Sequence, residues 1–296
     1  MKRAIRSVKI GNLTRVVLWM TGALLSFSGM AVSIRLLSAR LNLFEILSIR
    51  SGIGLAIMLV LLALKPAYRP LIRTNRIGLQ VFRNSVHYAA QYCWALALTL
   101  LPFATVFALE FIAPAWTALL AVWLLHEKLT GSRIGVVLLG LAGVLIILRP
   151  GVSDFHPAAL LVLLAAVGYA VVFISTKLLT STETTFGIIF WMTVIQLPLS
   201  LLGSDITFPM RMDQPAVLAA LTLGIAGTTS HYCLTNAFRA GDATLVVPLD
   251  FLRVPLIALI GWAFFGEALD VWVFVGAGVI LSGILWNLRA EAYRPH

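Results

Sequence analysis

Long apolar stretches, separated by short polar turns, fill almost the whole chain. Each stretch has roughly the 20 residues that a helix needs to cross a hydrocarbon core about 30 Å thick. The stretches are too long for membrane β-strands, and their side chains do not alternate as such strands require. The pattern therefore predicts ten transmembrane helices in an all-α integral membrane protein. They cover approximately residues 15–36, 44–64, 77–100, 103–125, 133–149, 157–178, 184–203, 215–238, 243–265 and 271–288.

Composition supports lipid as the solvent for most of the chain. The 296 residues are 60% hydrophobic and only 11% charged, whereas soluble domains carry about 25% charged residues. Ten spans and their turns occupy nearly all of this length, so we expect no separate soluble domain. Cys93 and Cys233 lie inside apolar stretches without metal-ligand spacing, so we expect neither a metal nor a cofactor.

Basic residues between the spans predict the orientation. With the N-terminus inside, fifteen Lys and Arg fall on the inner side and four on the outer side, which is the bias of cytoplasmic loops. This distribution accounts for the net charge of +10 without nucleic-acid binding. The apolar run 16–34 is longer than a signal-peptide core and lacks a cleavage motif, so we expect it to remain as the first helix. We predict a multi-pass protein of the inner membrane with both termini in the cytoplasm.

The chain repeats itself at a constant offset of 140 residues. Matches at this offset include Tyr92-Cys93 with Tyr232-Cys233, Glu110-Phe111 with Asp250-Phe251, Glu127 with Glu267, and Gly143 with Gly283. Five spans separate equivalent positions, and an odd number gives the two halves opposite orientations. We therefore predict two inverted five-helix repeats, residues 1–150 and 151–296. Such repeats are common in secondary transporters, whose substrate site lies between the halves near the midplane.

Two segments resemble the EamA repeat of the drug/metabolite transporter superfamily. They are residues 110–135, with the sequence EFIAPAWTALLAVWLLHEKLTGSRIG, and residues 250–276. The resemblance covers both halves and implies a secondary transporter of small organic metabolites without an ATPase subunit. Similar proteins export amino acids and other metabolites, or import riboflavin and S-adenosylmethionine. Pro114 and Pro255 are one residue out of the repeat register, so the two helix distortions need not match.

Five charged residues lie inside the predicted spans, where each costs roughly 2.5–3.5 kcal/mol on insertion scales. They are Arg50, Arg83, Glu110, Asp250 and Arg253. Their depths predict an outer ion pair between Arg50 and Glu110. They also predict an inner cluster in which Arg83 and Arg253 meet Asp250. We expect these groups either to hold the bundle together or to gate the chamber and bind charged parts of a substrate, and the pattern leaves both roles open.

Further polar and aromatic residues are predicted to line a central cavity. Four residues on one face of helix 77–100 follow steps of four, four and three, and the equivalent helix 215–238 carries a second polar stripe. Trp94 and Trp116 lie deep enough to stack on a flat ring. Each His could instead make an interhelical hydrogen bond. The predicted substrate-binding residues are Arg83, His87, Gln91, Trp94, Glu110, Trp116, His231, Thr235, Asn236, Asp250 and Arg253.

These features favour a secondary transporter of a flat, polar solute such as riboflavin, while aromatic amino acids and S-adenosylmethionine fit the same lining. A membrane-embedded enzyme is the rival class. The sequence contains no nucleophile elbow, H-E-x-x-H, P-loop or carboxylate-rich cluster, so we expect no enzyme. An assembly subunit is the third class, but it would not require charges placed symmetrically at depth. We expect the substrate and the lipid bilayer as partners, in a monomer or homodimer.

Overall fold

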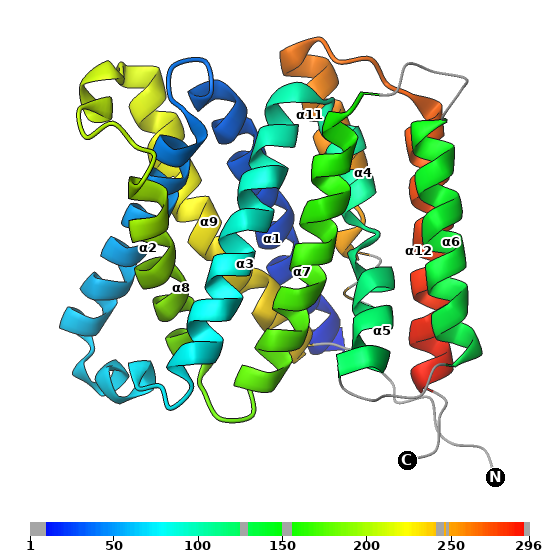
Figure 1. Cartoon of the computed structure of the whole chain (residues 1–296), viewed down its shortest axis with the longest axis horizontal. Coiled ribbons are helices and arrows are strands. Elements are labelled where there is room, and N and C mark those ends of the chain that lie inside the picture. Colours follow the sequence, from blue (N-terminus) through cyan, green and yellow to red (C-terminus); the bar gives the residue numbers. More distant parts are fainter. Residues whose placement is uncertain (1–9, 125–129, 150–155, 241–245, 247–248, 293–296) are drawn as a thin grey trace.

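Helices form all the regular structure in the part of the chain that the structure describes, which confirms the all-α prediction (Figure 1). The structure is a computed structural model that describes residues 10–124, 130–149, 156–240, 246 and 249–292. Its elements are α1 (Ile10–Leu37), α2 (Leu43–Leu64), η1 (Pro66–Ile72), α3 (Ile77–Leu100), α4 (Phe103–Glu110), α5 (Ala113–Leu124), α6 (Gly131–Leu148), α7 (Ala158–Leu179), α8 (Thr185–Leu201), η2 (Phe208–Arg211), α9 (Gln214–Ala240), α11 (Arg253–Phe265) and α12 (Val271–Ala292).

Seven of the described helical segments are long and apolar enough to cross a membrane. They cover residues 14–37, 43–64, 103–123, 131–148, 158–180, 214–237 and 271–290. Large apolar side chains such as Leu18, Leu64 and Leu218 are exposed on the outside of these helices, where lipid rather than water is their natural solvent. α8 and α11 are shorter apolar helices, and the polar stripe of α3 lowers its hydropathy. The chain is a multi-pass membrane protein.

One apolar segment is broken between α4 and α5. Phe111 and Ile112 form a turn there, in which the Ile112 N–H bonds to the Leu109 carbonyl at 3.2 Å. Pro114 lacks the N–H that would continue the helix. The same kind of turn precedes α11, where the Leu252 N–H bonds to the Leu249 carbonyl at 3.1 Å.

The two turns begin at equivalent positions of the sequence repeat. Phe111 and Phe251 are 140 residues apart, and each is the first residue of its turn. Pro114 and Pro255 do not share this spacing, so the prolines alone do not fix where each helix breaks. The two distortions therefore coincide even though the prolines do not.

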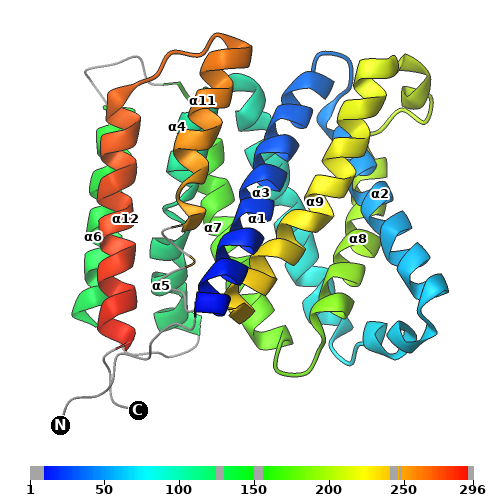
Figure 2. The same ribbon diagram turned by 180° about the vertical axis from the view of Figure 1, so that it is seen from behind.

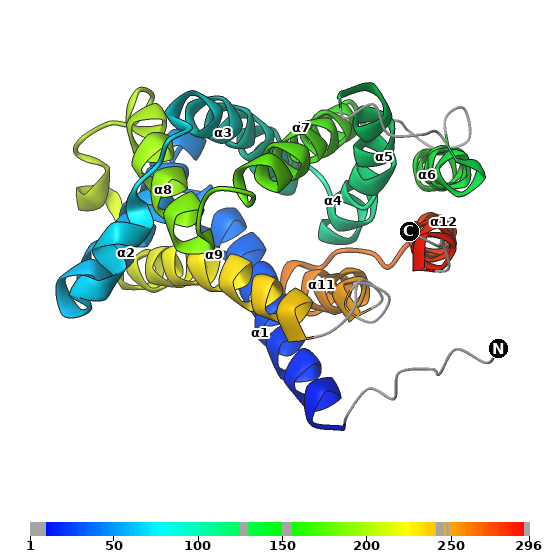
Figure 3. The same ribbon diagram turned by 90° about the horizontal axis from the view of Figure 1, so that it is seen from below.

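Helices from the two parts of the chain pack in pairs. α1 packs on α9, α3 on α7, α2 on α8, α4 on α11 and α6 on α12. Seen along the bundle, α6 and α12 form a pair at one edge (Figure 3). Their contact requires glycine, because a Cβ on Gly143 would lie 2.6 Å from the Gly276 carbonyl oxygen. Gly276 and Gly283 of α12 also lie against α6, whereas Gly278 faces open space.

α1 begins and α12 ends at the same end of the bundle (Figures 1 and 2). We call this the lower end, as drawn in Figure 1, and the opposite end the upper end. The turn between α1 and α2 and the turn between α11 and α12 both lie at the upper end. α6 begins at the lower end and α12 begins at the upper end, so these two packed helices are antiparallel.

Candidate functional site

The two broken segments bring three charged residues together inside the bundle. Glu110 is the last residue of α4, Asp250 lies just before α11, and Arg253 is the first residue of α11. Arg253 Nη2 donates a hydrogen bond to Asp250 Oδ2 at 2.6 Å, and Arg253 Nη1 lies 3.7 Å from Glu110 Oε1. One buried guanidinium thus sits between two carboxylates at repeat-equivalent positions. We call these three residues the acidic cluster.

Aromatic rings enclose the acidic cluster. The Trp94 indole donates to Glu110 Oε2 at 2.9 Å. The Arg253 guanidinium carbon lies 4.2 Å from the centre of the Phe27 ring and 5.3 Å from that of Phe111. Such cation–π contacts stabilise a cation that has little access to water. The cluster is therefore a charged centre held in an apolar, aromatic shell.

A second polar group lies where α2, α3 and α8 meet. Arg50 Nη1 donates to Gln91 Oε1 at 2.9 Å and lies 3.5 Å from Gln196 Oε1. Gln196 Nε2 donates to His87 Nδ1 at 2.8 Å. The His87 ring in turn lies 6.0 Å, centre to centre, from the ring of His231 on α9. We call Arg50, Gln91, Gln196, His87 and His231 the amide cluster.

Two of the predicted ion pairs are wrong. Arg50 does not pair with Glu110, because it points toward Gln91 and Gln196 instead. Arg83 does not reach Asp250, because its side chain is directed toward α7. Arg83 Nε donates to Thr176 Oγ1 at 2.7 Å, and Nη1 donates to Asn84 Oδ1 at 2.6 Å. Of the predicted contacts, the one between Arg253 and Asp250 is present.

The polar stripe of α3 faces the interior of the bundle. Arg83, His87, Gln91 and Trp94 are all buried. Fewer residues of the polar stripe of α9 contact this interior. His231 is half-buried and contacts His87, whereas the Thr235 hydroxyl and the Asn236 amide each donate to a carbonyl of α9 itself.

Trp116 is half-buried in α5, and its buried indole N–H has no hydrogen-bond partner among the described residues. It lies outside both clusters. Whether Trp116, Thr235 and Asn236 contact a substrate stays a prediction.

Gln196 and Tyr169 also belong to this interior, although neither was among the residues predicted from the sequence. Gln196 is fully buried in α8 and connects Arg50 with His87. The Tyr169 ring on α7 lies 5.9 Å from the His87 ring. Both are polar residues within apolar spans, which is the same signal that selected Arg50 from the sequence.

Above the clusters, one ion pair joins four segments of the upper end. The Arg35 guanidinium on α1 bonds to the Glu267 carboxylate in the α11–α12 turn. Glu267 Oε2 also accepts the Phe103 N–H at the start of α4, at 2.9 Å. Arg35 Nε donates to the Leu98 carbonyl near the end of α3, at 2.8 Å. We call this group the upper junction. Glu127, the repeat partner of Glu267, lies outside the described residues.

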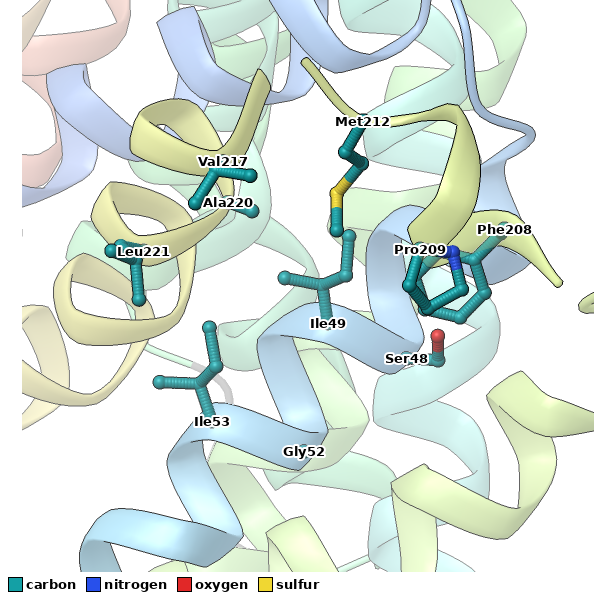
Figure 4. Close-up of a pocket in the computed structure, with 10 residues that line it drawn as sticks. All are labelled: Ser48, Ile49, Gly52, Ile53, Phe208, Pro209, Met212, Val217, Ala220 and Leu221. Atoms are coloured by element: carbon teal, nitrogen blue, oxygen red, sulfur yellow. The ribbon is translucent and has the colours of Figure 1, made fainter. Parts of the chain in front are cut away.

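A separate groove opens between α2, η2 and α9 (Figure 4). Its volume is about 350 Å³, and it is lined by Ser48, Ile49, Gly52, Ile53, Phe208, Pro209, Met212, Val217, Ala220 and Leu221. Because this lining is apolar apart from Ser48 and contains no charged residue, it does not suit a polar solute. Among the described residues, no group of three or more His, Cys, Asp or Glu is arranged to hold a metal ion.

Comparisons with known proteins place these features in a family. The model of the EamA-like transporter family matches residues 14–149 and again residues 156–289. The S-adenosylmethionine uptake transporter of Rickettsia bellii is 26% identical over 98% of this chain and 97% of its own length. The riboflavin transporter of Rhizobium johnstonii is 30% identical over 94% of this chain and 92% of its own length.

Two further comparisons span nearly the whole chain. The pseudopaline exporter of Pseudomonas aeruginosa is 26% identical over 90% of this chain and 93% of its own length. A solved crystal structure shares the fold with a TM-score of 0.60 at 20% identity, over 95% of this chain and 99% of that one. The chain belongs to the EamA-like transporter family and is a small-metabolite transporter.

Proposed function

We propose that this protein is a ten-span secondary carrier that moves a flat heteroaromatic metabolite across the inner membrane by alternating access. The observation that carries the proposal is the acidic cluster. It combines an acid from each half with one guanidinium, at the two helix breaks, inside an aromatic shell. Unwound spans at the contact of two repeats are where secondary transporters bind their substrates.

Inverted repeats are supported by helix boundaries that recur at the sequence offset. α5 and α11 begin 140 residues apart, at Ala113 and Arg253, and α6 and α12 begin 140 residues apart, at Gly131 and Val271. The packing is also consistent with a twofold relation. Exchanging the halves turns the α1–α9 contact into the α7–α3 contact, and both are present.

Cytoplasmic termini are supported by the placement of charge at the lower end. This end carries exposed basic residues in the segment that joins α2 to α3, namely Lys65, Arg69 and Arg76. Cytoplasmic loops are enriched in such residues. The lower end, where α1 begins and α12 ends, is therefore the cytoplasmic face in our proposal.

The aromatic lining supports a flat substrate. Trp94, Phe27 and Phe111 surround the acidic cluster, and two imidazole rings meet edge to face in the amide cluster. Riboflavin and S-adenosylmethionine, named for two relatives, both contain a fused heteroaromatic ring that can stack on such side chains. Export of an amino acid is the second candidate, because the half-buried acids of the cluster could bind an ammonium group.

The test is flux through the purified chain in proteoliposomes. We expect uptake of radiolabelled riboflavin, S-adenosylmethionine or an aromatic amino acid without any other protein. Replacing Glu110 by Gln should lower that flux about tenfold or more, the loss expected when a charge-assisted hydrogen bond is removed. The control is Asp213→Asn, which breaks an exposed ion pair with Arg40 and should leave flux unchanged.

Two results would contradict the proposal. One is the absence of flux for every compound. The other is normal flux through correctly folded Glu110→Gln protein, which would reduce the acidic cluster to a structural support.

A further inference from the structure

We propose that Arg50 binds an ionised acidic group of the substrate, so that the transported metabolite carries a carboxylate or another oxyanion. The inference rests on the proposed function and narrows its substrate class. Arg50 lies on α2, is only 5% exposed, and belongs to the amide cluster rather than to the acidic cluster.

Arg50 is a buried cation whose partners are neutral. Its hydrogen bonds go to the side-chain amides of Gln91 and Gln196. No carboxylate among the described residues lies within ion-pair distance of its guanidinium. Arg253 is the contrast, because it is equally buried but lies between Asp250 and Glu110. Burying a charge without a counter-ion costs several kcal/mol, so an unpaired buried guanidinium requires a functional reason.

The Arg50 guanidinium retains an unused donor. Its Nε is buried and has no hydrogen-bond partner among the described residues. A guanidinium presents its N–H groups in a planar fork that matches a carboxylate or phosphate through two parallel hydrogen bonds. Gln91 and Gln196 hold one edge of the group through Nη1, which leaves Nε available for such an anion.

Gly227 on α9 packs directly against the Arg50 side chain, next to this unused donor. A Cβ at position 227 would lie 2.8 Å from Arg50 Nε and 3.0 Å from Cγ. Any larger residue would therefore push the guanidinium away from its present position, although the charge would remain. A substitution at position 227 can therefore displace the Arg50 guanidinium while its positive charge is kept.

Arg83 is a weaker candidate, although it also has no carboxylate partner among the described residues. Its Nε and Nη1 both have hydrogen-bond acceptors, Thr176 and Asn84. Arg50, with its free Nε, is the better anion site. The two clusters and Arg83 together contain three guanidinium groups and two carboxylates, which favours an anionic group on the substrate.

This inference separates the candidate substrates. Riboflavin has no ionised group at neutral pH, whereas S-adenosylmethionine carries a carboxylate. The test uses matched pairs that differ only in the acid, namely S-adenosylmethionine with its decarboxylated analogue, and flavin mononucleotide with riboflavin. The first pair tests a carboxylate and the second tests a phosphate. Uptake of all four is measured in proteoliposomes containing the full chain.

The expected result is that the acidic member of at least one pair is transported and its neutralised counterpart is not. Arg50→Gln should lower uptake of that acid about tenfold or more, as for loss of a charge-assisted hydrogen bond. Arg50→Lys should retain part of the uptake, because lysine keeps the positive charge but lacks the planar pair of N–H donors. Gly227→Ala should also lower uptake. Gly78→Ala is the matched control, because a Cβ there meets open space.

Thermal unfolding of the same variants separates binding from folding. Arg50→Gln should leave the midpoint unchanged or raise it, since it removes a buried charge without a counter-ion. A lower midpoint together with unchanged preference for the acid would make Arg50 a structural residue and overturn the inference. Uptake of riboflavin that does not depend on Arg50 would overturn the inference but leave the proposed function standing. Absence of uptake for all four compounds would contradict the proposed function itself.

Discussion

Phe111 and Phe251, which are 140 residues apart in the chain, contact each other with ring centres 4.9 Å apart. Each follows directly after a carboxylate of the acidic cluster, and each begins the turn that interrupts its segment. In the inverted repeat that we propose, a residue that meets its own repeat equivalent lies close to the axis that relates the halves. The acidic cluster is therefore built where both halves of the chain meet.

Removing the cation of the acidic cluster should destabilise the fold. Arg253→Gln leaves the half-buried Glu110 and Asp250 near each other without a counter-charge, and we expect a loss of up to about 3 kcal/mol, below the full cost of a broken buried pair. Thermal unfolding in detergent measures this loss. Adding Glu110→Gln and Asp250→Asn to Arg253→Gln removes all three charges and should restore part of the stability. A triple variant no more stable than the single one would contradict this account of the cluster.

The contact between α6 and α12 should depend on Gly143. Gly143→Ala places a Cβ 2.6 Å from the Gly276 carbonyl oxygen, and this backbone atom cannot rotate away. We expect a loss of about 1–3 kcal/mol, as for other overpacked sites, measured as a lower unfolding midpoint. Gly278→Ala is the matched control on α12. It faces open space, so alanine should be neutral or slightly stabilising in that helix. Equal effects of the two substitutions would show that the helices are not in close contact.

The upper junction should hold the upper end closed. Glu267→Gln weakens the bonds to Arg35 and to the Phe103 N–H, and charge-assisted bonds of this kind contribute about 1.5–3 kcal/mol. We expect a single cysteine at Ala104, which is 8% exposed, to react about tenfold faster with a thiol reagent from the upper side, a change of about 1.4 kcal/mol. Asp213→Asn, which breaks an exposed pair at the same end, should not change the rate. Equal labelling rates in the Glu267→Gln and Asp213→Asn proteins would mean that the upper junction does not keep the upper end closed.

The amount of structure that could be predicted differs between the fold and the site. The lengths of the apolar stretches and the constant offset predict the helices and their equivalence, because both can be read along the chain. The contacts that side chains make between helices cannot be read in this way. Arg50 and Glu110 have similar depths, but depth does not define the rotation of a helix about its axis. Arg50 faces Gln91 and Gln196, while Glu110 faces Trp94 and Arg253.

Gln196 shows a second reason why the site was harder to predict than the fold. It is an uncharged residue on a buried polar face of α8 that also carries Thr193 and Ser200, so the sequence shows a polar residue within an apolar span but not its partners. Only the packing of α8 against α2 and α3 brings it to Arg50 and His87. The stripe of α3 was predictable because four residues repeat at helical spacing.

The central claim is that the two halves lie in opposite orientations in the membrane, and cysteine accessibility tests it most directly. Gly131 and Val271 are repeat equivalents, are exposed, and begin α6 and α12. Each is replaced by cysteine in protein whose Cys93 and Cys233 have been changed to alanine, and sealed right-side-out vesicles are treated with a membrane-impermeant thiol reagent. Our account predicts that Val271→Cys reacts in intact vesicles and that Gly131→Cys reacts only after the membrane is opened. Reaction of both positions from the same side would contradict it.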